Sequence, residues 1–513
     1  MTGKLLIRLI VMALLIALIA ACGAAPAAAP EAAAEPEAEE EMAEETSGPR
    51  QQPADLVEFI DNHEPGTLIT EAEWYEFLGD DQCTLESFHL ERAWTEAHLR
   101  YVDQMLMDRH PNVTVEYSHD IKAMDMMRLR LAAGDPMGVS RHGIHTSDLP
   151  VAAEQGFLLP ISILLDTEIT DEPGVPIGAR VNLEGVLAAS YGRGTDWEDV
   201  YSFGYDLTGY GLLFNYNLFV ENGWTTQPQT WEEFIELTDT IRESGMAPIC
   251  GRSGHWDVHI FTNGYLITKA GGPQAAVDMC NLEEGAFRNE AVVWAHEEVQ
   301  KLYQTPGNVL DGAEAMDGNA ALIELISGNC AMRMGEGTSP KSAATLAPDD
   351  FEWGFMWVPG PADGKGRAVG GHMGRGGGGQ LYAGNTLPAN CAKWGLEWLR
   401  LSSSHESALF FLTDSGTPLY FNTDISDVEV APHVDMLMAG VDAAEDHTFV
   451  AYPHGHSSVA KIYYESRDDL VYGDLTVEEF IENLETEAAR LRASDDWEYP
   501  GCTAENLGLV PRE

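Results

Sequence analysis

The sequence predicts an α/β protein, and two stretches of the chain carry that prediction. In the first, strand and helix patterns alternate, with strands at 84–90 and 113–117 and helices at 91–109 and 121–133. This β-α-β-α order is typical of mostly parallel sheets flanked by helices. The second stretch, residues 210–245, has the pattern of a strand, a short helix, a turn and a longer helix.

The second stretch has clear signals at the ends of its elements. The apolar run 211–214 is long enough for a buried strand. Asn215 can cap the short helix that follows, and Gly223 can end it. Thr230 and Glu233 have the spacing of a capping box, which predicts that the longer helix begins there.

Residues 1–22 have the pattern of an export signal. Lys4 and Arg8 give a positive start, and the apolar run 9–21 is too short to span a bilayer comfortably. The run ends in Ile-Ala-Ala-Cys, which resembles a bacterial lipoprotein signal. That resemblance implies cleavage before Cys22, acylation of its sulfur and anchoring to the membrane. The alternative is an ordinary secretion signal with an incidental cysteine.

Residues 23–53 are rich in Ala, Pro and Glu, a composition that cannot bury enough apolar surface to fold. We expect a disordered tether there, followed by an N-terminal extension at 54–82. Such a tether suits a module that docks on a membrane partner. It suits an anchored enzyme equally well.

The charge of the chain restricts its partners. Its 513 residues include 83 acidic and 29 basic side chains, a formal net charge of −54. This excess argues against nucleic acid or an anionic membrane surface as a partner. Because acidic residues occur along the whole chain, they indicate a solvated surface rather than a site for a cationic solute.

The cysteines predict disulfides without fixing which pairs form. An exported chain with an even number of cysteines can oxidise them, and fifteen connectivities are open. No pair has CxxC spacing, which argues against zinc. The six that follow the signal are Cys83, Cys250, Cys280, Cys330, Cys391 and Cys502.

A family resemblance rests first on residues 215–234. Asn-Tyr-Asn at 215–217, Gly-Trp at 223–224 and Pro-Gln-Thr-Trp-Glu-Glu-Phe at 228–234 resemble the signature of family 1 extracellular solute-binding proteins, which serve carbohydrate ABC transporters. The strand entry at 322–334 and the start of the last helix at 473–479 are also similar to that family. The resemblance covers about residues 84–492 and leaves 54–82 unexplained.

The resemblance implies a two-lobed periplasmic-binding-protein-like fold of type II, in which three crossings join the lobes. Each lobe would have a mostly parallel sheet flanked by helices. The expected boundaries are 83–207 with 378–412 for the first lobe, 208–377 with 413–495 for the second, and a tail at 496–513. The implied function is capture of a sugar or oligosaccharide between the lobes and delivery to an ABC permease on the extracytoplasmic face. No cofactor and no enzymatic activity are implied.

The loop after the strand at 248–250 is the strongest candidate for ligand contact. Loops at the ends of strands bind ligands in open α/β sheets. Trp256 can stack on the C–H face of a pyranose, while His255 and Asp257 can hydrogen-bond its hydroxyls. A core tryptophan is the alternative. The other predicted contacts are Tyr205, Asp206, Phe88, His89, Glu336 and His372.

Two further functions stay open at this point. The same fold could bind a polyol, a phosphate ester or a peptide, or the chain could be an anchored hydrolase. GxSxG, HExxH and SxxK motifs with partners do not occur, which favours binding over hydrolysis. The glycine-rich run 370–379 matches GxGxxG formally, but a strand-like segment follows it, so we predict no dinucleotide site.

Overall fold

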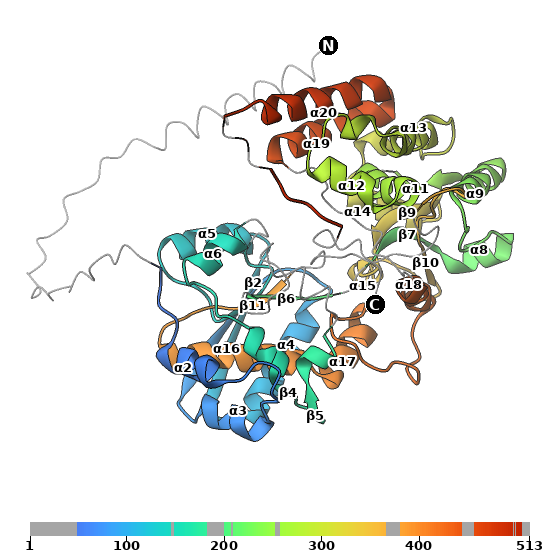
Figure 1. Cartoon of the computed structure of the whole chain (residues 1–513). Helices are drawn as coiled ribbons and strands as arrows, with labels where there is room; N and C mark the ends of the chain where they lie inside the picture. The colour runs from blue at the N-terminus through green and yellow to red at the C-terminus, as the bar shows by residue number, and fades with distance from the viewer. Residues whose placement is uncertain are drawn as a thin grey trace, which may run out of the picture. The chain divides into compact units, whose positions relative to one another are not determined.

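The computed structural model describes residues 49–144, 148–181, 200–206, 209–251, 257–365, 380–443, 456–495, 497 and 499–504 (Figure 1). The predicted signal, Cys22 and all of the tether up to residue 48 lie outside the described residues. Pro49–Glu513 form one compact unit. No helix among the described residues is long and apolar enough to cross a bilayer.

The first lobe is built on a five-stranded sheet. β1 (Cys83–Leu90) pairs in parallel with β2 and β3, and β11 pairs antiparallel with β3 and β6. The strand order is β2-β1-β3-β11-β6. The remaining bounds are Val113–Asp120 for β2, Val139–Arg141 for β3, Phe203–Gly204 for β6 and Gln380–Ala383 for β11.

Helices cover both faces of this sheet. On one face, α4 (Glu96–Arg109) and α16 (Ala389–Ser402) supply buried side chains to a large apolar core. On the other face, α5 (Ala123–Ala132) and α6 (Leu149–Glu154) pack over a smaller apolar cluster. α17 (His405–Ser415) packs against α4. Successive residues of a strand therefore point into different clusters, as its pleat requires.

The second lobe has a four-stranded sheet in the order β10-β7-β9-β8. The bounds are Tyr210–Asn215 for β7, Ala247–Ile249 for β8, Cys330–Glu336 for β9 and Trp353–Met356 for β10. Its apolar core is separate from that of the first lobe. Figure 1 shows the helices of each lobe gathered around its own sheet. The larger helices are α8 (Tyr216–Asn222), α9 (Trp231–Glu243), α12 (Pro273–Cys280), α13 (Glu290–Gln304), α14 (Gly318–Ile326), α18 (Pro432–Ala443), α19 (Ser457–Tyr472) and α20 (Val477–Arg492).

The expectation of mostly parallel sheets needs a correction, because both sheets are mixed. In the second lobe, β7 runs antiparallel to both of its neighbours, and only β8 and β9 are parallel. The reason is the crossing itself. Tyr210, the first residue of β7, pairs with Glu336, the last residue of β9. β7 leads away from the crossing and β9 returns toward it, so the two must run in opposite directions.

The predicted ends of the elements in residues 210–245 are confirmed, with one difference. The side chain of Asn215 accepts the N–H of Leu218, and Gly223 ends α8 in the left-handed region with φ 66°. Thr230 accepts the N–H of Glu233. The Glu233 carboxylate, however, accepts the N–H of Gln229 rather than that of Thr230, so the capping box is displaced by one residue.

The extension at 54–82 is part of the first lobe. It forms α2 (Ala54–Asn62) and α3 (Glu71–Leu78), which bury Leu56, Trp74 and Leu78 in the core of that lobe. Sequence reasoning left this segment unexplained. Because the extension buries three large apolar side chains, it is part of the apolar core of the first lobe and not a surface addition.

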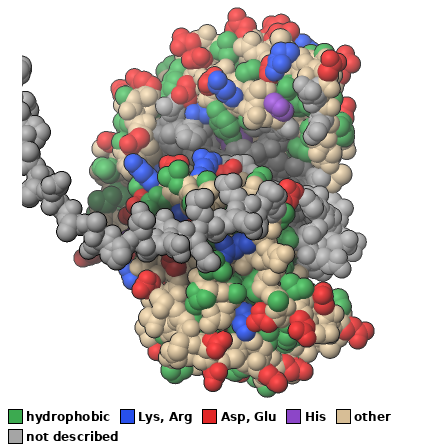
Figure 2. All heavy atoms as spheres, turned by 90° about the vertical axis from the view of Figure 1, so that its left-hand side faces the viewer, with side chains coloured by type: hydrophobic (Ala, Val, Ile, Leu, Met, Phe, Trp, Pro, Cys, Tyr) green, Lys and Arg blue, Asp and Glu red, His purple; other side chains and the backbone are tan. Residues whose placement is uncertain are grey.

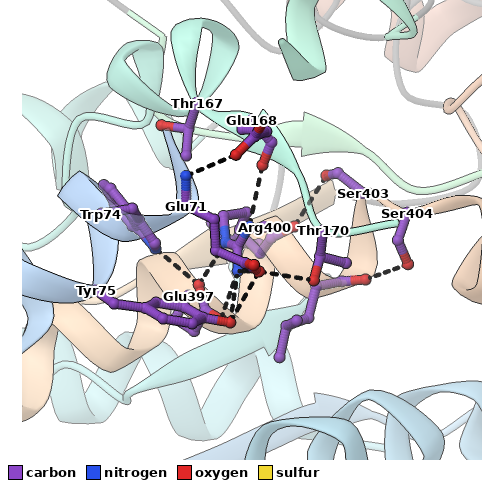
Figure 3. Close-up of polar contacts among 12 residues, drawn as sticks. Glu71, Trp74, Tyr75, Thr167, Glu168, Thr170, Glu397, Arg400, Ser403 and Ser404 are labelled. Carbon is purple, nitrogen blue, oxygen red and sulfur yellow. Dashed lines mark hydrogen bonds and ion pairs between the residues drawn. The ribbon is translucent and has the colours of Figure 1, made fainter. Parts of the chain in front are cut away.

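A buried polar network joins α3 to α16 (Figure 3). Glu397 and Arg400 are fully buried, and Nε of Arg400 lies 2.7 Å from Oε2 of Glu397. The indole N–H of Trp74 donates to the same oxygen at 2.7 Å. Arg400 also donates to the carbonyl of Glu168 at 3.0 Å and lies 3.2 Å from Oε1 of Glu71. The two charges thus satisfy each other inside the core.

Residues 50–52 attach the chain to the first lobe ahead of α2. The N–H of Arg50 donates to the carbonyl of Gln155 at 2.9 Å, and its guanidinium donates to the carbonyl of Gly134 at 3.0 Å. The Gln52 amide donates to the carbonyl of Leu158 at 2.9 Å. The described chain therefore enters the fold on the first lobe.

Three disulfides select one of the fifteen connectivities. They join Cys83 to Cys391, Cys250 to Cys330, and Cys280 to Cys502. The first links β1 to α16, the second links the end of β8 to the start of β9, and the third holds the C-terminal segment against α12. Each lies within one lobe or its tail. On the face drawn in Figure 2, acidic side chains are scattered across the surface, as the composition predicts.

Candidate functional site

The three crossings are hydrogen-bonded to one another where they leave the first lobe. Gln380, at the end of the second crossing, pairs with Gly204 at the start of the first. Asp206 on the first crossing forms a β-bridge with Leu419 on the third. The N–H of Tyr420 donates to the carbonyl of Tyr205 at 3.2 Å. The crossings are thus joined to one another at the β11–β6 edge of the first-lobe sheet and are not three independent linkers.

Alternation along this sheet sorts side chains onto two faces. Phe203 and Tyr205 point into the large core of the first lobe. Ser202 and Asp206 alternate with them and therefore take the opposite face, which they share with Gln380 through its pairing with Gly204. We call Ser202, Asp206 and Gln380 the crossing cluster.

The polar atoms of the crossing cluster are buried and have no partner among the described residues. Ser202 and Gln380 are fully buried and Asp206 is 4% exposed. Within the described part of the chain, no other residue hydrogen-bonds the Ser202 hydroxyl, either oxygen of the Asp206 carboxyl group, or either atom of the Gln380 amide. A buried polar atom without a partner costs about 1–3 kcal/mol, so a group of them needs an explanation such as a ligand.

The carboxyl group of Asp206 titrates near neutral pH. Burial raises its pKa to about 7, the charge of Arg141 acts against this rise, and the charge of Glu336 adds to it. In its protonated form the group can donate and accept a hydrogen bond, whereas the carboxylate can only accept.

Arg141 brings a buried cation to the same end of the sheet. It is the last residue of β3 and is 3% exposed. Its guanidinium carbon lies 4.5 Å from the ring centroid of Trp94 and 5.1 Å from that of Tyr205. These distances are within the range of cation–π attraction. The Tyr205 hydroxyl lies 2.7 Å from Nδ1 of His98, which fixes the ring under Arg141.

The second lobe contributes Glu336 to the candidate site at the crossings. It ends β9, half-buried, where its carboxylate accepts hydrogen bonds from the hydroxyls of Tyr210 and Thr338, the latter at 3.1 Å. Its charge acts on both Asp206 and Arg141, so it lies close enough to couple with them electrostatically. Residues of both lobes therefore converge at the crossings.

The remaining predicted contacts lie elsewhere. Phe88 is buried under α5 and α6, in the smaller apolar cluster of the first lobe. His89 is fully buried on the α4 and α16 face of β1. His255, Trp256 and His372 lie outside the described residues, and Asp257 is described only as the first residue of α10 (Asp257–His259).

Sequence reasoning missed Arg141, Ser202 and Gln380. An arginine at the carboxyl end of a short buried strand is the one local signal that could have drawn attention to Arg141. Ser202 and Gln380 carry no such signal, because their importance comes from strand pairing between segments far apart in the sequence.

Two of the surface cavities lined by described residues lie away from the crossings. One, of about 130 Å³, lies at the start of β1 beside Arg50 and Arg130. The other, of about 380 Å³, lies on the extension between Phe59, Phe77 and His63. The second has no buried polar side chain that lacks a partner among the described residues, and the first has one, the hydroxyl of Thr386. Three such side chains meet at the crossings, so we place the candidate site there.

The match to known proteins agrees with this two-lobed architecture. Residues 94–390 match the family of bacterial extracellular solute-binding proteins, and the chain belongs to that family. It is 22% identical over 221 residues to the diacetylchitobiose binding protein NgcE of Streptomyces coelicolor; the match spans 41% of this chain and 43% of that protein. The chain thus spans under half the length of this curated relative.

Solved structures share the fold at low sequence identity. A chitin oligosaccharide binding protein superposes with a TM-score of 0.62 and 18% identity, over 81% of this chain and all of that one. The structure of RafE in complex with raffinose superposes with a TM-score of 0.57 and 17% identity, over 80% of this chain and all of RafE. These likenesses establish a two-lobed solute-binding fold.

Proposed function

We propose that this protein captures a sugar or oligosaccharide between its two lobes, at the crossing cluster, and presents it to an ABC permease. The observation that carries the proposal is the set of buried polar atoms on Ser202, Asp206 and Gln380 that have no partner in the part of the chain that the structure describes. Sugar hydroxyls both donate and accept hydrogen bonds, so they suit a carboxyl group, an amide and a hydroxyl together. The family and the names of its sugar-binding relatives support the same solute class.

The loop after β8 completes the site in this proposal. Trp256 supplies the ring on which the sugar stacks, with His255 and Asp257 as hydrogen-bonding neighbours. Tyr205, Phe88 and His89, also predicted as contacts, are buried in the first lobe. We also propose His372 as a contact to the solute.

The mechanism is closure on the solute. A ligand that contacts groups of both lobes, such as Asp206 and Glu336, binds the closed state better than the open state and raises its population. The permease then recognises the closed form. The protein carries out no chemistry on the sugar, and it works on the extracytoplasmic side, anchored by a lipid on Cys22.

A thermal-shift screen tests the proposal. The sugars are diacetylchitobiose, chitin oligosaccharides, xylan-derived oligosaccharides and raffinose. A ligand that binds only the folded state stabilises it by about 2.7 kcal/mol at 100 times its Kd. We expect at least one sugar to raise Tm, and we expect Trp256→Ala and Asp206→Asn to lose that shift while remaining folded. Turnover of the sugar, or no shift with the whole panel, would overturn the proposal.

A further inference from the structure

β11 pairs with β3 on one side up to Arg141, whereas on the β1 side the end of β3 is held by a side chain. β1 and β3 are paired only at Ser87 and Val139. Two residues further along each strand, the N–H of Arg141 donates to Nδ1 of His89 at 2.8 Å. The imidazole nitrogen thus takes the place of the backbone carbonyl that a continued ladder would have supplied.

This hydrogen bond is the first in a chain that crosses the lobe. Because Nδ1 of His89 accepts, the neutral ring carries its proton on Nε2, which donates to Oγ of Ser87 at 2.6 Å. Ser87 in turn donates to Oδ1 of Asp103 at 2.9 Å, and the indole of Trp398 donates to the same oxygen at 2.7 Å. The chain joins β3 and β1 to α4 and α16.

The atom order excludes a serine nucleophile. In a hydrolase triad, the histidine accepts the serine proton and the carboxylate orients the histidine. Here the Ser87 hydroxyl donates its hydrogen bond to Asp103, and both nitrogens of His89 are already hydrogen-bonded. All three residues are buried, with exposures of 0% for Ser87 and His89 and 4% for Asp103. Ser87, His89 and Asp103 therefore have a structural role.

The acceptor on His89 persists at ordinary pH. Burial, together with the positive charge of Arg141, lowers the pKa of His89 to about 3. His98 and His119 act in the same direction. Burial raises the pKa of Asp103 to about 6, against the hydrogen bonds from Trp398 and Ser87. The ring stays neutral, which keeps Nδ1 available to the backbone.

We propose that His89 is a positioning residue for solute binding, which fixes the last residue of β3 so that the Arg141 guanidinium lies over Trp94 and Tyr205 beside the crossing cluster. The sequence predicted His89 as a direct contact; the structure assigns it an indirect role through Arg141. The inference deepens the proposed function and rests on it where it concerns solute affinity. Its claim about β3 itself can be tested without any solute.

The matched pair of variants is His89→Phe and His89→Asn. Phenylalanine fills the space but has no acceptor, whereas the asparagine side-chain oxygen comes close to the position of Nδ1. We expect His89→Phe to speed amide exchange at Arg141 and to weaken binding of diacetylchitobiose. Apparent Kd rises by the inverse of the fraction of molecules that keep the site in place, about tenfold if one in ten does. His89→Asn should restore most of both properties.

Two controls separate positioning from a general loss of stability. Trp74→Phe removes a buried donor at the junction of α3 and α16, so it should lower Tm and leave Kd and Arg141 exchange unchanged. In an Arg141→Met background, His89→Phe should have no further effect on Kd, because coupled residues are not additive. An undiminished effect there would overturn the inference.

The remaining outcomes are equally decisive. Unchanged exchange at Arg141 in a folded His89→Phe protein would refute the role of His89, whatever the solute does. If the wild type binds no sugar of the panel, the proposed function fails, while exchange at Arg141 still tests the positioning of β3. If His89→Phe does not fold, nitrogen NMR of the wild-type ring decides: an Nε2–H tautomer supports the inference, and an Nδ1–H tautomer overturns it.

Discussion

Asp206 on the first crossing is bridged through its backbone to Leu419 on the third, and this pairing holds a carboxyl group in a buried position. The bridge fixes the backbone, but it supplies no hydrogen bond to the carboxyl group from another described residue. The pH dependence of stability should therefore report on this side chain.

We predict that stability falls as pH rises from about 4 to about 7. Burial raises the folded-state pKa of Asp206 from 3.8 to about 7, so in that window the folded protein keeps a proton that the unfolded chain has lost. Each pH unit in this window lowers the free energy of unfolding by about 1.4 kcal/mol at most. Urea unfolding across this pH range, compared between wild type and Asp206→Asn, isolates the effect. A wild-type slope that Asp206→Asn leaves unchanged would contradict it.

The buried ion pair between α3 and α16 predicts a large effect of Arg400→Met. That change leaves Glu397 charged and without its main partner in the core, which costs about 3–5 kcal/mol. Arg490→Met is the matched control, since Arg490 pairs with Glu487 on the surface with 62% of its side chain exposed. We expect a clear loss of Tm for the first and little change for the second. Similar changes in Tm for the two variants would mean that the buried network does not stabilise the protein more than a surface ion pair.

The extension should be indispensable even though it lies outside the segment matched to the family. A protein that begins at Cys83 lacks Leu56, Trp74 and Leu78, whose burial contributes about 6 kcal/mol at about 2 kcal/mol each. That is comparable to the whole stability of many domains. We expect this protein to aggregate or to lose its cooperative unfolding transition. A protein that begins at Pro49 should unfold like the full chain, and calorimetry distinguishes the two.

The disulfide between β8 and β9 predicts a defined loss of stability. Cys250 and Cys330 are fully buried and 80 residues apart in sequence. In the chain-entropy model, closing a loop of this length adds about 4 kcal/mol to the free energy of unfolding. Replacing both by alanine should lower the unfolding midpoint accordingly. Mass spectrometry of an unreduced digest checks the pairing, and a peptide that links Cys250 to any other cysteine would refute it.

Local signals in the sequence predicted the elements well, because helix caps depend on neighbours a few residues away. The cap at Asn215 forms as expected, and the side chain of Thr230 caps α9. The mixed direction of the strands was not predicted, because it depends on where the chain returns after a crossing. Tyr210 and Glu336 meet in the sheet, yet nothing near either residue in sequence indicates this.

The candidate site was predicted only in part for the same reason. Asp206 and Glu336 are polar residues at strand ends, which sequence patterns can identify. Gln380 joins them through pairing with Gly204, and Arg141 joins them because β3 lies beside β11. His89 was predicted as a direct contact. Its burial among α4, α16 and β1 could only be learned from packing.

The attachment of residues 50–52 has a mechanical consequence. Tension applied to the chain ahead of Pro49 would enter the fold through Arg50 and Gln52, which are hydrogen-bonded to the first lobe. The force would then spread into α3 and α16 through Trp74 and Glu397. The force would reach the second lobe only through the crossings. Tension on the chain ahead of Pro49 would therefore restrain the first lobe and leave the second lobe able to rotate about the crossings.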